Sequence, residues 1–121
     1  MPKNFEQLDA FQNAVDLSVA IYRATSNFPQ DERYELTRQL RCASISVISN
    51  IAEGQGRLTN GEWRQFLSHA RGSLFEIQAQ LLVASRLGLL DEQRYRSLRS
   101  AVIKVAKPLA GLIDYVRRRE A

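Results

Sequence analysis

The segment NIAEGQGRLTNGE, residues 50–62, joins two long runs of helically spaced apolar residues. Gly54 follows the last apolar position of the first run, and glycine readily takes the left-handed conformation that ends a helix. Thr59 and Glu62 form a capping-box pattern, in which each side chain satisfies a free backbone N–H at the start of the next helix. The connection between these signals is short, so we expect the two helices to lie side by side in opposite directions.

Four segments of the chain show this helical spacing. Their apolar residues recur every three or four positions, as expected for amphipathic helices with one face in a core. No segment alternates in the manner of a β-strand. We predict an all-α fold, an antiparallel up-down-up-down four-helix bundle in a single domain spanning residues 1–121, with helices at residues 8–26, 32–54, 60–87 and 91–118.

Prolines and a capping residue mark the other helix boundaries. The first helix ends just before Pro29, because the residue preceding a proline is driven out of helical conformation. Asp91 is placed to cap the fourth helix. Pro108 lies inside that helix, where it removes one hydrogen bond and crowds the carbonyl of Lys104, so we expect a kink.

Composition limits the classes of protein to which the chain can belong. It has 121 residues, of which 45% are apolar and 25% charged, typical of a globular domain with one core. No apolar run approaches the roughly 18–20 residues that span a bilayer, and the start lacks a secretory signal pattern. Cys42 is the single cysteine, which we expect to be buried as a small apolar residue. We expect a cytoplasmic protein without membrane contact.

The charge is unevenly distributed along the chain. Residues 1–35 hold three basic and six acidic side chains, whereas residues 36–121 hold 14 basic and seven acidic ones. Arginine supplies 14 of the 17 basic residues, and its planar guanidinium suits phosphate and carboxylate groups. Two rows of residues are candidates for nucleic-acid contacts. One contains Arg96, Arg99, Lys107, Arg117 and Arg118 on the fourth helix, and the other runs from the preceding loop along the third helix and contains Arg57, Arg64 and Arg71.

Two interpretations of these rows remain open. In one, the basic rows bind nucleic acid through its phosphates, with weak sequence specificity because the few aromatic residues lie mostly at core positions. In the other, the arginines form a solvated face that pairs with acidic side chains on neighbouring helices.

Polar residues form a stripe beside the apolar face of the second helix: Gln39, Ser46, Asn50 and Glu53. A similar stripe on the third helix contains His69, Ser73, Glu76 and Gln80. We interpret them as a hydrogen-bonded network that fixes register within the hairpin or between subunits. The residues supply no catalytic triad, and Phe66 stands where a di-iron Glu-x-x-His motif would require glutamate. We therefore expect neither enzymatic activity, nor a metal site, nor a cofactor.

One set of residues recurs in a known family: Leu36, Gln39, Leu40, Arg41, Ala43, Ser46, the run from Asn50 to Gly54, Arg57, Glu62, Phe66, Leu67, Ala70, Gly72, Ser73, Leu74, Glu76, Gln80, Leu81, Leu87 and Gly88. Through these residues the sequence resembles the four-helix-bundle family of ribosomal intervening-sequence proteins, encoded in 23S rRNA intervening sequences or by stand-alone genes. Two positions depart from the family pattern: Pro108 is unusual in the last helix, and Cys42 stands where arginine is frequent.

The resemblance implies an assembly and a set of partners. It implies a ring-like homopentamer of antiparallel bundles around a central channel. Relatives act as accessory variability proteins of diversity-generating retroelements, and they bind nucleic acid and a reverse transcriptase through basic surfaces. Our first hypothesis is therefore a non-enzymatic, oligomeric nucleic-acid-binding protein. The alternative is a protein-interaction scaffold or adaptor whose basic surface meets an acidic partner, with no direct nucleic-acid role.

Overall fold

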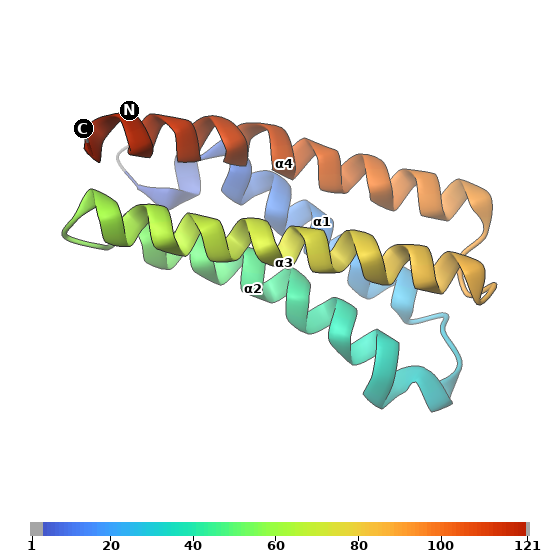
Figure 1. The fold of residues 1–121 in the computed structure, drawn as a ribbon. Coiled ribbons are helices and arrows are strands. Elements are labelled where there is room, and N and C mark those ends of the chain that lie inside the picture. Colours follow the sequence, from blue (N-terminus) through green and yellow to red (C-terminus); the bar gives the residue numbers. More distant parts are fainter. Residues whose placement is uncertain (1–3, 121) are drawn as a thin grey trace.

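The computed structural model describes residues 4–120, apart from the side chains of Arg33 and Tyr34. This part of the chain contains four α-helices and no β-strand (Figure 1). Two short helical turns, η1 and η2, are of the 3-10 type, and η3 is a π-helical turn. In chain order the elements are η1 Phe5–Gln7, α1 Asp9–Thr25, η2 Gln30–Glu32, η3 Arg33–Thr37, α2 Arg38–Gln55, α3 Asn60–Arg86 and α4 Glu92–Glu120.

The four helices pack in a cycle around one core. α1 contacts α2 and α4, and α3 contacts the same two helices. The start of α3 lies beside the end of α4, and the side-chain amide of Asn60 donates a hydrogen bond to the Arg119 carbonyl there at 3.4 Å. Every helix contributes fully buried side chains to this core, among them Leu17, Ile21, Leu40, Val47, Ile51, Leu67, Ile77, Leu81, Val102, Val105, Leu109 and Val116.

The start of the second helix differs from the prediction. We expected a helix from residue 32, but α-helical geometry begins at Arg38, after the turns η2 and η3. Phe28 and Leu36 are both buried on either side of Pro29, whose fixed φ sets the direction of the chain. The wider π-helical turn carries the chain from this anchored corner into α2.

Gly54 does not cap a helix in a left-handed conformation, contrary to our expectation. α2 continues to Gln55, and the glycine with positive φ is Gly88, after α3, at 79°. Gly54 is buried against α3, where a Cβ atom would lie 3.0 Å from Cδ1 of Trp63 and 3.1 Å from Cβ of Phe66. A glycine is required here by the close approach of two helices and not by a turn.

Pro108 lies within a helix that continues unbroken from Glu92 to Glu120. The proline has no N–H to offer the carbonyl of Lys104, four residues earlier. That carbonyl accepts a hydrogen bond from the side-chain amide of Asn13 on α1 at 2.9 Å. A contact from a neighbouring helix therefore replaces the missing bond.

Cys42 is exposed, which corrects the expectation that it is buried. Its neighbours Leu40 and Ala43 face the core from the same turn of α2. Successive residues differ by about 100° around a helix, so Cys42 points to solvent.

Candidate nucleic-acid interface

Side-chain caps form at Thr59 and Asp91, where the sequence predicted them, but Thr59 and Glu62 do not form the reciprocal capping box that we expected, because the Glu62 carboxylate accepts from the Thr59 hydroxyl and not from a backbone N–H. The backbone N–H of Glu62 donates to Thr59 Oγ1 at 3.1 Å, and the Thr59 hydroxyl donates to Glu62 Oε1 at 3.2 Å. The N–H of Arg94 donates to Asp91 Oδ1 at 2.8 Å. Such caps stabilise a helix end by about 1 kcal/mol and fix the residue at which the helix begins.

α4 carries more basic side chains than any other helix. Between Glu92 and Glu120 the sequence has eight basic residues and three acidic ones. The five α4 residues predicted to contact nucleic acid are all exposed. Within residues 4–120, Arg99, Lys107 and Arg117 form no ion pair and no hydrogen bond through their side chains. Arg99 and Lys107 therefore have no acidic partner there, and Arg117 acts only through the charge by which it helps Arg118 to lower the pKa of Asp114.

The other two predicted residues of α4 are paired along the helix. Arg96 Nε lies 2.9 Å from Glu92 Oε1, and Arg118 pairs with Asp114. The hydrogen bond from Arg118, together with its positive charge, lowers the pKa of the Asp114 carboxyl from its ordinary value. Exposed i,i+4 pairs of this kind contribute little to stability because solvent screens them, so a phosphate group can compete for either arginine.

Two arginines of the predicted α3 row lie on the side of α3 that faces α4. Arg64 Nε lies 2.5 Å from Glu120 Oε1 at the end of α4. The Arg71 guanidinium lies 5.7 Å from the centre of the Phe75 ring, which is 58% exposed. Arg64 and Arg71 therefore extend the basic surface of α4 onto α3, and we call this combined surface the α3–α4 face.

Arg57 does not share the α3–α4 face, which corrects the predicted single row. Its guanidinium lies 4.5 Å from the centre of the Phe66 ring and 4.0 Å from Glu53 Oε2. Phe66 and Arg64 project from nearly opposite sides of α3, because two residues turn a helix by about 200°. Arg57 consequently lies on the side of α3 that faces α2.

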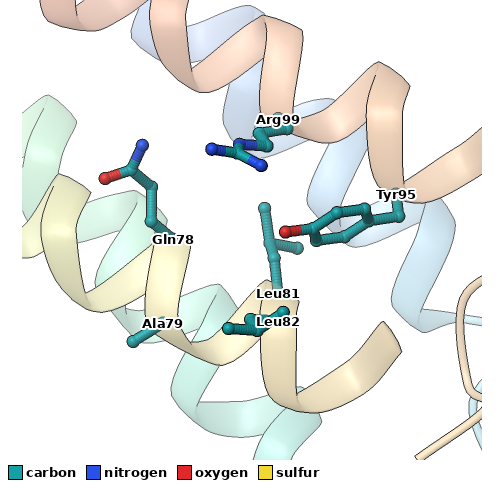
Figure 2. Close-up of a pocket in the computed structure, with 6 residues that line it drawn as sticks. All are labelled: Gln78, Ala79, Leu81, Leu82, Tyr95 and Arg99. Carbon is teal, nitrogen blue, oxygen red and sulfur yellow. The ribbon is translucent and has the colours of Figure 1, made fainter. Parts of the chain in front are cut away.

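A pocket opens on the α3–α4 face, with a volume of about 350 Å³. Figure 2 shows the polar ends of Gln78 and Arg99 facing one another across it, and the Tyr95 hydroxyl pointing toward Leu81. Within the described residues none of these three polar groups has a hydrogen-bond or ion-pair partner. The lining residues are Gln78, Ala79, Leu81, Leu82, Tyr95 and Arg99.

A second hollow of about 220 Å³ adjoins this pocket. Gln78 lines both hollows, and Arg71 and Phe75 line the second one together with Ala106 and Ala110 of α4. The α3–α4 face therefore has a groove with apolar walls and arginines at two points along it. We did not predict Phe75 or Gln78 as functional residues. The available signal was an aromatic residue out of register with the core positions of α3 and four residues from an arginine.

Within residues 4–120 the polar stripes of α2 and α3 are joined by a hydrogen bond at one point. Ser73 Oγ donates to Ser46 Oγ at 2.9 Å, and the Asn50 amide donates to the Ser46 carbonyl at 2.8 Å. Ser46, Asn50 and Ser73 thus form a small network between the helices. A further serine pair, Ser18 and Ser44, joins α1 to α2 at 2.9 Å in the core.

The remaining stripe residues stay outside this network. Gln39, Glu53 and Glu76 are exposed, and Glu53 instead lies near Arg57. His69 is also exposed, beside the ring of Phe66. Burying a carboxylate without a partner is costly, and the hairpin places both glutamates at its solvent edge. The predicted network is therefore smaller than the sequence pattern indicated.

Two further hollows lie on the sides of the bundle that include α2. The α1–α2 groove, of about 480 Å³, is lined by Val15, Ser18, Val19, Tyr22, Arg23, Ile45 and Ile48. The α2–α3 groove, of about 320 Å³, is lined by Glu32, Glu35, Leu36, Gln39, Ala79, Gln80, Val83 and Leu87. Each exposes apolar side chains: Val19, Tyr22 and Ile45 in the first, Val83 and Leu87 in the second. Contiguous exposed apolar residues of this kind mark interaction surfaces.

Neither metal ligands nor membrane-spanning segments occur among residues 4–120. No three histidine, cysteine, aspartate or glutamate side chains come together there in a way that would hold an ion. None of the helices described is both long and apolar enough to cross a membrane. What the α3–α4 face offers chemically is positive charge, hydrogen-bond donors and an apolar groove.

Comparisons with known proteins agree with the helical architecture. A family model described as 23S rRNA-intervening sequence protein matches residues 6–111. A crystal structure of a protein of unknown function from the S23 ribosomal protein family of Bacteroides thetaiotaomicron VPI-5482 superposes with a TM-score of 0.78. It is 18% identical, and the alignment covers 87% of this chain and 95% of that one. No curated protein sequence matches the chain.

Proposed function

The chain belongs to the 23S rRNA-intervening sequence protein family, and from this premise we propose that it is a non-enzymatic, oligomeric, cytoplasmic protein that binds structured RNA or DNA. The arginine-rich α3–α4 face is the proposed contact surface. The observation that carries the proposal is the group of exposed cations on α4, Arg99, Lys107 and Arg117, which have no partner within residues 4–120.

The physical basis of the proposal is counterion release. Each phosphate that a cation neutralises frees condensed counterions, so the logarithm of affinity falls with the logarithm of salt concentration by about 0.9 per contact on duplex DNA. Arg64, Arg71, Arg96 and Arg118 add further contacts once a phosphate displaces their present partners. Such binding depends on the backbone and shape of the nucleic acid more than on its sequence.

Fluorescence anisotropy of a labelled RNA hairpin and a labelled DNA duplex, measured at several salt concentrations, tests the function. We expect binding whose logarithmic salt slope corresponds to several phosphate contacts. Absence of binding at low salt would overturn the proposal and favour the protein-scaffold alternative.

We further infer that the four helices alternate in direction and that copies of the chain assemble head to tail. The contact between the start of α3 and the end of α4 supports the alternating order. The α1–α2 groove and the α2–α3 groove offer two different apolar surfaces, as a head-to-tail contact requires. Arg23 borders the first groove, and Glu32 and Glu35 border the second, so their charges are complementary.

The positions of these grooves favour a closed ring. Both include α2, so they lie on neighbouring sides of the bundle, and successive contacts curve instead of running straight. In such a ring α2 faces the axis and α4 faces outward, which leaves the α3–α4 face accessible. The family resemblance supports a homopentamer, whose summed charge of about +20 would strengthen attraction of a polyanion. Light scattering on the purified chain tests this; a monomer would overturn it.

A protein-interaction scaffold is the second candidate function. The same cations suit an acidic protein, such as an acidic surface of a reverse transcriptase, and the exposed apolar residues of the grooves suit protein contacts. Alanine at Arg96, Arg99 and Lys107 separates the two functions. Loss of RNA and DNA binding supports the first, whereas loss of a protein partner alone supports the second.

A further inference from the structure

We propose that the pocket between Gln78, Tyr95 and Arg99 receives the base of an unpaired nucleotide. The inference rests on the proposed nucleic-acid-binding function and adds which part of the ligand is recognised. It changes the expected mode of binding, because phosphate contacts alone do not distinguish a paired stretch from a bulge or loop.

The hydrogen-bonding groups of the pocket match the edge of a base. Gln78 carries both donors and an acceptor, the Tyr95 hydroxyl is donor and acceptor, and Arg99 carries donors only. All three lack partners within residues 4–120, and the guanidinium of Arg99 faces the amide of Gln78 (Figure 2). Base edges present donors and acceptors side by side, so a base engages the mixed pair while its phosphate engages Arg99.

The walls and size of the pocket also suit a flat heteroaromatic ring. Leu81 and Leu82 supply apolar surface, and the volume of about 350 Å³ lies at the lower end of the range for small-ligand pockets, roughly 300–1,000 Å³. Leu82 remains 40% exposed, an apolar side chain that a bound base would cover.

The adjoining hollow provides a place for the next nucleotide. Phe75 is 58% exposed, and the Arg71 guanidinium lies 5.7 Å from the centre of its ring. An exposed aromatic ring beside an arginine is the arrangement on which single-stranded bases stack, and each such base contributes about 1–3 kcal/mol. Since Gln78 lines both hollows, two successive bases have neighbouring sites.

An acidic peptide fits this pocket less well than a nucleotide. Its carboxylates can pair with Arg71 and Arg99, and its backbone N–H groups can donate to the Gln78 oxygen. Neither group stacks on the exposed ring of Phe75, whereas a base does. The exposed ring, together with the mixed donor and acceptor pattern, therefore favours a base.

The test compares two labelled RNA hairpins that are identical except for two successive unpaired nucleotides in a bulge. Anisotropy titrations use the full chain and four variants: Tyr95→Phe, Gln78→Leu, Phe75→Ala and, as a matched control on the other side of α3, Gln65→Leu. Gln65 is exposed and lines none of the hollows described here. Tyr95→Phe retains the ring and removes the hydroxyl alone, so it leaves packing intact.

We expect the wild-type chain to bind the bulged hairpin about tenfold more tightly than the paired one, in line with one stacked base. Tyr95→Phe, Gln78→Leu and Phe75→Ala each reduce that ratio, while the affinity for the paired hairpin and its salt slope stay unchanged. Gln65→Leu leaves the ratio as in the wild type.

Three other results would overturn the inference, and they separate it from the proposed function. Equal, salt-dependent binding of both hairpins removes the base site and leaves phosphate binding in place. A preference for the bulge that the pocket variants leave intact places base recognition elsewhere. Binding of a poly-glutamate peptide, with neither hairpin bound, overturns both the base site and the nucleic-acid function in favour of an acidic protein partner.

Discussion

The α3–α4 face and the α1–α2 groove are both hollows between neighbouring helices, yet they differ in the groups around them. The first has Arg71 and Arg99 beside its apolar walls, with further cations along α4. The second has a greater volume than either hollow of the α3–α4 face taken alone, and it has one charged lining residue, Arg23. The same bundle geometry therefore yields one surface suited to a polyanion and one suited to an apolar protein surface.

This difference indicates that charge and not shape assigns the roles of the two surfaces. Packing four amphipathic helices leaves shallow grooves on every side, because ridges of side chains cannot fill all the space between cylinders. A groove with free cations gains affinity for phosphate. A groove without them gains most from covering its exposed Val19, Tyr22 and Ile45.

We expect the largest effect from replacing Gly54, because both surfaces depend on the packing of α2 against α3. In Gly54→Val the new side chain would meet Trp63 and Phe66, where even a Cβ atom lies 3.0–3.1 Å from them. Overpacking of a core costs about 1–3 kcal/mol, and we expect a loss near the upper end in urea unfolding followed by circular dichroism.

Gly72→Ala is the matched control for this change. A Cβ atom at Gly72 meets nothing within 4 Å, and alanine favours a helix by about 0.5–1 kcal/mol over glycine. We expect stabilisation at Gly72 and destabilisation at Gly54. Equal effects at both glycines would show that α2 and α3 are not held in close contact at Gly54.

Removing the free cations should weaken nucleic-acid binding by the α3–α4 face without changing the α1–α2 groove. In the triple variant Arg99→Ala, Lys107→Ala and Arg117→Ala, the logarithmic salt slope of nucleic-acid binding should fall by about three units in magnitude. Oligomer mass should not change. Arg57→Ala, on the α2 side of α3 and close to Glu53, should leave the slope near that of the wild type; an equal loss there would contradict a separate α3–α4 face.

A charge placed in the α1–α2 groove should weaken assembly of the chain without changing the α3–α4 face. Ile45→Asp puts a carboxylate among apolar residues, and burying it without a partner is costly, so we expect a smaller mass by light scattering at concentrations where the wild type is assembled. Ile103→Asp is the control, since the two isoleucines are 44% and 43% exposed. Assembly lost equally in both variants would contradict a contact specific to the α1–α2 groove.

Asp114→Asn should have the smallest effect, and it tests how one ion pair of α4 affects nucleic-acid binding by the α3–α4 face. It releases Arg118 and removes one negative charge from α4, so binding of a paired RNA hairpin should become about two- to threefold tighter at low salt. The pKa of Asp114 is lowered by Arg118, so the carboxylate stays charged below the ordinary range of an aspartate. Wild type and variant should converge only as pH falls through that lowered pKa; convergence already at neutral pH would contradict the ion pair.

Much of the fold was predictable because helix signals are local. The apolar spacing of α1, α3 and α4 placed their ends within one or two residues of those observed. The caps at Thr59 and Asp91 form as expected. The start of α2 was less predictable, since its N-cap residue Thr37 forms no capping hydrogen bond through its side chain, and burial of Phe28 and Leu36 sets the path of the chain there.

The candidate site was predictable only in part. The exposed cations of α4 follow from their position opposite the core residues on a single helix. The separation of Arg57 from Arg64, the exposure of Phe75 and the convergence of Gln78 with Arg99 depend on how α3 lies against α2 and α4. The exposed positions of Glu53 and Glu76 likewise depend on the distance between packed helices.

Local sequence signals were sufficient to predict four amphipathic helices and the residues at which most of them begin and end. They also showed that basic residues accumulate in the last helix. Periodicity, caps and composition act within one helix, so they need no knowledge of neighbours. Three features depend on the packing of the helices and could not be predicted. Gly54 allows α2 and α3 to approach closely, and Asn13 donates to the Lys104 carbonyl that Pro108 leaves free. Gln78, Tyr95 and Arg99 line one pocket. These features join residues far apart in the chain, whose proximity arises from packing of the core.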